Sequence, residues 1–217
     1  MVVFAIALLW LAAYLLGSIP TGYLVAKAVK GIDIREYGSG GTGATNVLRT
    51  VGKAAAIAVL LIDMLKGLGA VLLVNAAWPS LETTFAGSGL TAAWQPWVTT
   101  LAALMALIGH GRSIWINFTG GKSAASGLGV LLGLAWPVAL GAVAAFTITL
   151  AVSRIVSLSS IAAASVTIVL MVATGQPLAY GVLALLGGVY VILRHRSNID
   201  RLLAGTEPRL GQSTSKS

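Results

Sequence analysis

Long apolar segments recur along this chain and restrict its fold more than any other feature. Polar linkers divide them into seven runs: 2–25, 54–78, 97–108, 124–135, 138–152, 161–174 and 178–193. About 20 apolar residues can cross a bilayer as an α-helix, which satisfies its own backbone groups where no water is available. The pattern predicts an all-α integral membrane protein with about seven transmembrane helices.

The composition agrees with a membrane environment. Hydrophobic residues make up 57% of the 217 residues, charged residues only 9%, and the mean hydropathy is +0.92. A water-soluble domain of this composition would expose too much apolar surface. The first run lacks a basic n-region and a small-residue cleavage site, so we expect an uncleaved helix. We expect residues 1–217 to form one polytopic domain, with a flexible tail over about 205–217.

Residue types exclude several kinds of site. The chain has no cysteine and two histidines, so we expect no disulfide, thiol nucleophile, metal site or cofactor. The formal net charge is +8. Such a charge can indicate nucleic-acid binding, but in a membrane protein it more often reflects cytoplasmic loops that face anionic lipid or substrate. We expect no nucleic-acid partner.

The positive charges predict the orientation. If the N-terminus lies outside, linkers 27–53, 110–122 and 153–160 and the tail from 194 share one face. They hold 13 of the 14 Lys and Arg residues, all except Lys66. The positive-inside rule places that face, and the C-terminus, in the cytoplasm. The polar linkers can therefore converge on one cytoplasmic site.

The linker segment GSGGTGATNVLR is the strongest candidate site. Its glycines and donors are Gly38, Ser39, Gly40, Gly41, Thr42, Gly43, Thr45, Asn46 and Arg49. Glycines that adopt positive φ can expose successive N–H groups as an anion-binding nest, and Arg49 can hold an oxyanion bidentately. A phosphate is the expected ligand. A flexible linker is the competing interpretation, and a Rossmann fingerprint is disfavoured because no strand precedes it.

A second glycine loop, IWINFTGGKS, precedes an apolar run. Gly120, Gly121 and Lys122 at a helix N-terminus suit a phosphate. A nucleotide-binding P-loop is disfavoured, because Ile116 stands where its first glycine belongs and no strand precedes the loop. The stretch SLSS adds candidate hydroxyl donors: Ser157, Ser159 and Ser160.

Two ionisable residues interrupt the second apolar run. Asp63 and Lys66 lie three residues apart, so they share a helix face and can pair. Charges at that depth normally face protein or water. A structural ion pair and a direct substrate role both remain open. His110, at the end of the third run, is expected to be structural.

Together these motifs resemble the bacterial acyl-phosphate-dependent glycerol-3-phosphate acyltransferases, the PlsY family. The resemblance covers nearly the whole length, through GSIPTGYL, GSGGTGATNVLR, DMLKG, IGHGRSIWINFTGGKS, SLSS and RHRSNIDRLLAGTEP. It implies a multi-pass inner-membrane enzyme that begins phospholipid biosynthesis. Such an enzyme moves a fatty acyl group from acyl phosphate to the 1-hydroxyl of sn-glycerol 3-phosphate, giving lysophosphatidic acid and phosphate. The acyl tail would lie among the helices or in membrane lipid.

The resemblance and the motif chemistry assign roles to matching residues. The catalytic candidates are Ser39, Arg49, Lys122, His195 and Asn198. The phosphate-binding candidates are Gly38, Gly40, Thr42, Gly43, Asn46, Gly120, Gly121, Ser157, Ser159 and Ser160. Asp63, Lys66 and Glu207 are expected to be structural near the site, Glu207 by ordering the tail. The proton acceptor stays open between His195 and a substrate phosphate.

Two other functions compete. His195 to Asp200 reads H-x-x-x-x-D, the signature of acyltransferases with thioester donors, but no other motif of that superfamily accompanies it. Basic linkers at helix ends also suit a transporter of phosphate or phosphate esters. A transporter is expected to carry an internal repeat and a mid-membrane site, and the sequence suggests neither.

Overall fold

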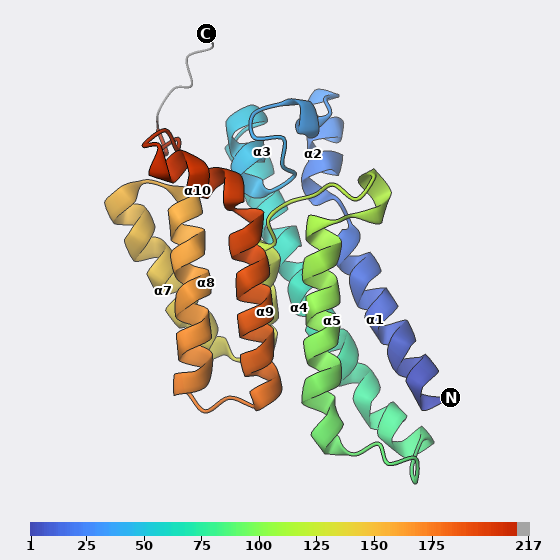
Figure 1. Ribbon diagram of the computed structural model, residues 1–217. Helices are drawn as coiled ribbons and strands as arrows, with labels where there is room; N and C mark the ends of the chain where they lie inside the picture. Colours follow the sequence, from blue (N-terminus) through green and yellow to red (C-terminus); the bar gives the residue numbers. More distant parts are fainter. Residues whose placement is uncertain (212–217) are drawn as a thin grey trace.

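The computed structural model describes residues 1–211, and its regular elements over that range are helices (Figure 1). The longer helices are α1 (Val2–Ser18), α2 (Thr21–Lys30), α3 (Ala44–Thr50), α4 (Lys53–Thr84), α5 (Gln95–Gly111), α6 (Ala124–Leu134), α7 (Trp136–Ser153), α8 (Val156–Ala173), α9 (Leu178–Arg194) and α10 (Arg196–Leu203). Three short 3₁₀ turns cover Ile34–Glu36, Ala92–Trp94 and Ile114–Ile116. The predicted all-α class is confirmed.

Five segments are long and apolar enough to cross a membrane: Val2–Lys30, Lys53–Thr84, Ala92–Gly111, Trp136–Ser153 and Val156–Ala173. A sixth candidate joins α9 and α10, which meet at a 60° bend. The predicted run 124–135 forms α6, which has 11 residues and at 1.5 Å per residue is only about 16 Å long. The structure therefore has five or six full-length candidate spans and one short apolar helix, where the sequence predicts about seven spans.

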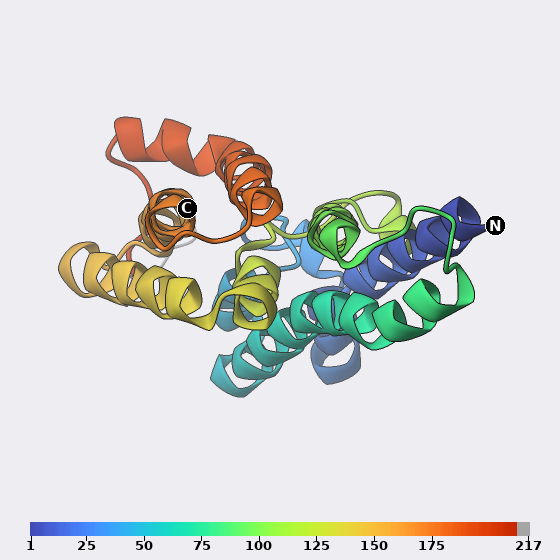
Figure 2. The same cartoon turned by 90° about the horizontal axis from the view of Figure 1, so that it is seen from below.

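The long helices form two groups. α1, α4 and α5 lie on one side, α7, α8 and α9 on the other, and α6 lies between them (Figure 2). α1 packs along α5, α4 along α6, and α7 along α8, while α5 and α9 join the groups. Glycines allow the close approaches: a Cβ on Gly67 would overlap the Ser126 carbonyl, and one on Gly129 would overlap the Met64 carbonyl. Small residues commonly permit such packing in membranes.

The break between α1 and α2 lies within an apolar segment, yet its carbonyl groups are satisfied. Pro20 cannot donate a backbone hydrogen bond, so the helix cannot continue regularly through it. The Lys66 Nζ donates to the Ile19 carbonyl at 2.9 Å, and the Ser113 hydroxyl donates to the Ser18 carbonyl. Side chains from α4 and the loop after α5 thus stabilise the break.

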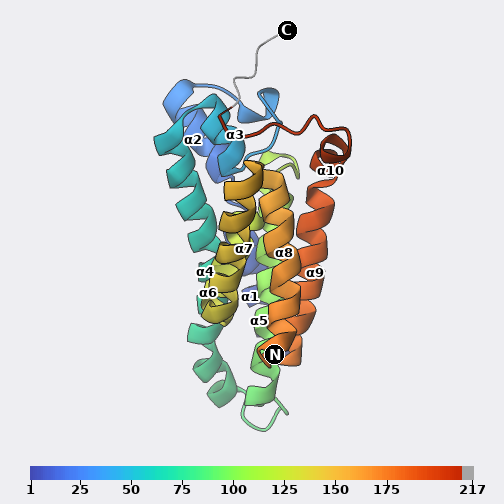
Figure 3. The same cartoon turned by 90° about the vertical axis from the view of Figure 1, so that its left-hand side faces the viewer.

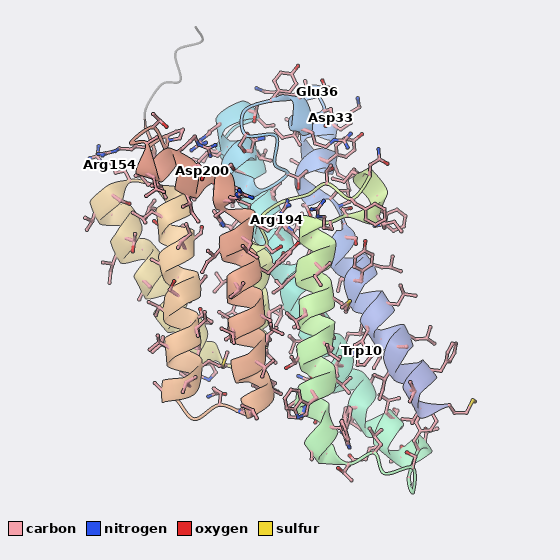
Figure 4. The ribbon with its side chains drawn as sticks, viewed as in Figure 1. Trp10, Asp33, Glu36, Arg154, Arg194 and Asp200 are labelled. Atoms are coloured by element: carbon pink, nitrogen blue, oxygen red, sulfur yellow. The ribbon has the colours of Figure 1, made fainter. Side chains whose placement is uncertain are left out.

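The polar segments gather at one end of the bundle. α2, α3 and α10 lie at this end, and the N-terminus lies toward the other (Figures 1 and 3). Figure 4 places Asp33, Arg154, Arg194 and Asp200 at the same end, whereas Trp10 lies well away from it. This convergence is the arrangement that the charge pattern predicts.

The segment after α10 is docked as far as it is described. Glu207 is buried, and the Leu210 N–H donates to the Arg154 carbonyl at 2.8 Å. The prediction of a flexible tail over 205–217 does not fit these contacts. The donors that hold the Glu207 carboxylate are Ser157 on α8, far away in sequence, and Asn198 and Arg201 on the preceding α10. Residues 212–217 lie outside the described part of the chain.

Replacing Gly129 with Ala is expected to lower the free energy of unfolding by about 1–3 kcal/mol, because the new methyl overlaps backbone of α4. Thermal unfolding in detergent micelles measures this change. Gly181→Ala is the matched control, since apart from its chain neighbours and its own helix backbone a Cβ there would meet no atom of residues 1–211 within 4 Å. Equal melting temperatures for the two variants would contradict the proposed tight α4–α6 contact.

Candidate active site

A cavity of about 430 Å³ lies where the polar segments converge. Its polar part, here called the cavity mouth, contains Ser39, Arg49, Lys122, His195 and Asn198. Its other walls, here called the apolar chamber, come mainly from α6 to α9 and include Leu128, Leu131, Val143, Phe146 and Leu183. One continuous cavity therefore joins cationic and hydrogen-bonding groups to a hydrocarbon-lined space.

The predicted site residues divide into two sets. Those that line the cavity are Ser39, Gly43, Asn46, Arg49, Asp63, Gly121, Lys122, Ser157, Ser160, His195, Asn198 and Glu207. Those that do not are Gly38, Gly40, Thr42, Lys66, Gly120 and Ser159. The cavity also contains His110 and Ser123, to which the sequence analysis gave no role in binding. The polar linkers meet as predicted, and of their predicted glycines Gly43 and Gly121 line the cavity whereas Gly38, Gly40 and Gly120 do not.

The first glycine segment adopts positive φ at only part of its length. Gly38 and Gly40 have φ of +58° and +69°, in the left-handed region that favours glycine. Gly43 is extended, with φ of −78°, and α3 begins directly after it. Thr42 is buried, and a Cβ on Gly22 would overlap its carbonyl oxygen. Gly38, Gly40 and Thr42 thus shape the loop and its contact with α2.

Asn46 uses its side chain to hold the loop. Its Oδ1 accepts from the Ser39 N–H at 3.1 Å, and its Nδ2 donates to the carbonyls of Tyr37 and Gly41 at 3.0 and 2.9 Å. Both polar atoms of the side-chain amide are therefore hydrogen-bonded to backbone groups of the loop. These contacts support a structural role in place of the predicted phosphate contact, because both polar atoms already have partners.

Arg49 remains available to an anion. Its exposed side chain lines the cavity, and none of the side-chain hydrogen bonds or ion pairs found within residues 1–211 involves its guanidinium. Ser39 is likewise exposed at the mouth. A planar guanidinium beside a hydroxyl is well suited to a phosphate.

The second glycine loop packs against the end of α5. The Gly121 N–H donates to the His110 carbonyl at 3.1 Å, and a Cβ on Gly120 or Gly121 would overlap His110. Neither glycine is among the residues with positive φ. The Gly121 N–H therefore already has a protein partner, and both positions are glycine because α5 approaches closely; the predicted phosphate contact of Gly120 and Gly121 stays a prediction. The Arg194 guanidinium braces the loop by donating to both glycine carbonyls at 3.0–3.3 Å.

Lys122 begins a buried hydrogen-bond chain. Its Nζ donates to Asn198 Oδ1 at 2.5 Å, and Asn198 Nδ2 donates to Glu207 Oε1 at 2.6 Å. Glu207 also accepts from Ser157 Oγ at 2.6 Å and from Arg201 Nε at 2.7 Å. The carboxylate thereby orients the Asn198 amide so that its oxygen faces the lysine.

Burial and neighbouring charges alter the electrostatics of this chain. Burial lowers the pKa of Lys122 to about 8; Glu207 offsets part of this shift, while Arg201, Arg49 and Arg194 add to it. Burial alone would raise the pKa of Glu207, but hydrogen bonds from Ser157, Asn198 and Arg201 outweigh it and lower that pKa. Lys122 is cationic at neutral pH and loses its charge in the mildly alkaline range.

The SLSS hydroxyls donate to protein atoms. Ser159 Oγ donates to the Ile155 carbonyl at 2.8 Å and Ser160 Oγ to the Val156 carbonyl at 3.0 Å. Such bonds to the carbonyl four residues back are common for serine within a helix. With Ser157 bonded to Glu207, the predicted donation of these hydroxyls to a phosphate is not supported.

His195 follows α9 and is buried at the cavity mouth. Its Nδ1 lies 2.8 Å from the Val191 carbonyl; since a carbonyl only accepts, Nδ1 carries the proton and Nε2 is the acceptor. Burial lowers the pKa of His195 to about 4, against the raising effect of the Val191 bond. The ring is neutral at pH 7. Because Nδ1 is bonded to Val191, it is not oriented by Asp200 as the H-x-x-x-x-D hypothesis requires.

Asp63 and Lys66 form the predicted pair. Asp63 Oδ1 lies 2.8 Å from Lys66 Nζ and 3.6 Å from His110 Nδ1, and the exposed fraction of each side chain is 5% or less. His110 thus joins a buried polar cluster that the sequence analysis missed. The available signal was the occurrence of polar residues in two successive apolar runs.

Comparison with known proteins connects this site to a family. The profile described as Glycerol-3-phosphate acyltransferase matches residues 7–205. The chain belongs to this family. A relative named Glycerol-3-phosphate acyltransferase from Rippkaea orientalis is 57% identical over 205 residues, covering 94% of this chain and 93% of the relative. Another from Acaryochloris marina is 54% identical over 206 residues, covering 94% and 92%.

Solved structures agree with the family assignment. A crystal structure of PlsY (YgiH), an integral membrane glycerol 3-phosphate acyltransferase, in its glycerol 3-phosphate form has a TM-score of 0.82 and 36% identity to this chain. The matched region covers 95% of this chain and 96% of that chain. The lysophosphatidic acid form has a TM-score of 0.80 and 35% identity at the same coverage. This acyltransferase-family chain is therefore a multi-pass membrane protein.

Affinity of the cavity for a phosphate monoester is expected to fall as pH rises through about 8. Free Lys122 loses its proton there, so the dissociation constant should increase about tenfold between pH 7 and pH 9 if only the cationic form binds. Isothermal titration calorimetry with glycerol 3-phosphate measures this. In Lys122→Arg the charge persists across the range, so the dependence should disappear; an unchanged pH dependence would assign it to another group.

Proposed function

We propose that this protein transfers a fatty acyl group from acyl phosphate to the 1-hydroxyl of sn-glycerol 3-phosphate. The products are lysophosphatidic acid and inorganic phosphate. The observation that carries the proposal is the single cavity in which Arg49 and Lys122 lie at the mouth of an apolar chamber. The mouth suits phosphate groups and the chamber suits a fatty tail. Family membership supports the reaction class, and the PlsY ligand forms support glycerol 3-phosphate as the acceptor.

The chemistry requires positioning and charge stabilisation. The 1-hydroxyl oxygen attacks the acyl carbonyl carbon, the bond from that carbon to the phosphate oxygen breaks, and phosphate leaves. Acyl phosphate is a mixed anhydride and already activated, so holding both substrates in line supplies much of the acceleration. In this proposal Arg49 and Ser39 contact the donor phosphate, and Lys122 contacts the glycerol 3-phosphate.

A substrate phosphate is the better proton acceptor. With a pKa of about 4, the His195 Nε2 binds a proton weakly at neutral pH. A phosphate monoester has a second pKa of about 6 and is the stronger base. The single proton of the attacking 1-hydroxyl then passes to phosphate, and His195 Nε2 accepts a hydrogen bond from the 2-hydroxyl of glycerol 3-phosphate and so orients the acceptor.

The proposal includes a location and a topology. Residues 1–217 form one polytopic domain of the bacterial inner membrane in contact with its lipids, and α6 counts as a short seventh passage. The N-terminus lies outside, and the C-terminus and the site face the cytoplasm. The positive-inside rule supports this, because within residues 1–211 every Lys and Arg except Lys66 belongs to segments at the site end. A phosphate-ester transporter is not favoured, because the family is one of acyltransferases.

Arg49→Ala is expected to lower kcat/KM by about 100-fold or more, as loss of a single charge-stabilising donor does elsewhere. The assay follows phosphate release and lysophosphatidic acid formation from palmitoyl phosphate and glycerol 3-phosphate in detergent or vesicles. Arg196→Ala is the matched control, since Arg196 is exposed at the same end and does not line the cavity.

Donor choice separates the alternatives. Product from palmitoyl phosphate but not from palmitoyl-CoA supports the proposed reaction. Product from palmitoyl-CoA would revive the H-x-x-x-x-D hypothesis. If neither donor gives product, and vesicles take up a phosphate ester, the protein is a transporter.

The topology can be tested with single cysteines, because the chain has none. Ser88 and Ser197 are exposed and lie in segments at opposite ends of the bundle. A membrane-impermeant maleimide added to intact spheroplasts is expected to label Ser88→Cys and not Ser197→Cys. Labelling of both variants after lysis is the control, and the reverse pattern in intact cells would invert the topology.

A further inference from the structure

His110 lies between the buried ion pair and the second glycine loop. One edge of its ring, at Nδ1, is 3.6 Å from Asp63 Oδ1. The other edge, at Nε2, occupies the space that a Cβ on Gly121 would need. The His110 carbonyl accepts the Gly121 N–H at 3.1 Å. The same residue therefore contacts the loop through both its backbone and its imidazole.

The loop carries Lys122 directly after this contact. Gly121 is followed in sequence by Lys122, whose Nζ reaches Asn198 across the cavity mouth. Arg194 also donates to the Gly121 carbonyl, at 3.0 Å. A shift of the imidazole would free Gly121 to move toward α5, and Lys122 would move with it.

The position of the imidazole depends in turn on the buried ion pair of α4. Asp63 forms an ion pair with Lys66, whose Nζ lies 2.8 Å from Asp63 Oδ1, and Lys66 donates to the Ile19 carbonyl at the break between α1 and α2. Asp63 and His110 are both buried, with exposed fractions of 1% and 5%. His110 Nδ1 has no hydrogen-bond partner within residues 1–211, so the Asp63 carboxylate at 3.6 Å acts on the ring electrostatically and favours orientations that keep Nδ1 toward α4.

We propose that His110 is a positioning residue for glycerol 3-phosphate binding. Asp63 orients its imidazole, the imidazole sets the position of Gly121, and Gly121 sets Lys122 over the cavity. This inference rests on the proposed function for its kinetic readout. A purely structural role would alter folding and the active fraction, whereas positioning alters one substrate's KM.

Two amide substitutions at His110 distinguish the contribution of Nδ1 from that of Nε2. Asn places an amide near the Nδ1 position facing Asp63, while Gln reaches the Nε2 position beside Gly121. His110→Asn is expected to raise the KM for glycerol 3-phosphate by roughly 10-fold or more, because small displacements of binding groups are costly. The KM for acyl phosphate and kcat should stay within about threefold. His110→Gln should restore much of the affinity.

A double-mutant cycle tests the contact itself. Gly121→Ala is expected to raise the KM for glycerol 3-phosphate, since its methyl overlaps the imidazole. Combining it with His110→Ala removes the overlap, so the combined effect on KM should be smaller than the product of the single effects. Gly181→Ala is the control for adding a methyl to a helix without a steric conflict.

Clear outcomes overturn the proposal. It fails if His110→Asn and Gly121→Ala keep the wild-type KM for glycerol 3-phosphate, if both substrates' KM values change equally, or if the cycle effects multiply. If size-exclusion chromatography shows that His110→Ala does not fold, the KM values of Gly121→Ala and His110→Gln for glycerol 3-phosphate still test the proposal. Inactive wild-type protein would instead contradict the proposed function.

Discussion

A buried ion pair in the membrane region organises the polar end of this protein. Asp63 and Lys66 are almost completely excluded from solvent, and neither charge is stable at that depth without compensation. The compensation comes from each other and from groups that must lie nearby: His110 on α5 and the Ile19 carbonyl at the α1–α2 break. One electrostatic requirement therefore fixes α4, α5 and the α1–α2 break relative to one another. The loops at the cavity mouth lie on this framework.

The glycines around the cavity serve two physical purposes. Gly38 and Gly40 allow a left-handed backbone that brings Ser39 to the mouth. Gly22, Gly120 and Gly121 have no need of unusual φ, but a side chain there would overlap a neighbouring segment. Arg49 and Lys122 both line the cavity, where the tightly packed glycine loops bring them together, and we propose that they provide its capacity to bind anions.

The cavity also combines a polar and an apolar environment. Its mouth holds charges and amides, and its chamber is lined by aliphatic and aromatic side chains of α6 to α9. The short α6 makes this possible, because it ends partway along its neighbours and leaves α7 to return to the polar end. A substrate with an ionic head and a hydrocarbon tail can place each part in a matching environment without leaving the membrane surface.

The sequence by itself determined the membrane class, the approximate helices and the side on which polar linkers gather, because these follow from local hydropathy and charge. It also identified Arg49, Lys122, His195 and Asn198, through residue type and motif resemblance. Only the tertiary structure decided how those groups are used. Asn46 and the SLSS hydroxyls proved to have protein partners, the second glycine loop proved to be a close contact, and Glu207 and His110 joined networks with distant residues. Such roles depend on which residues of α4, α5, α8 and α10 come into contact. Hydropathy and charge are local properties of the sequence, so they do not specify contacts between helices.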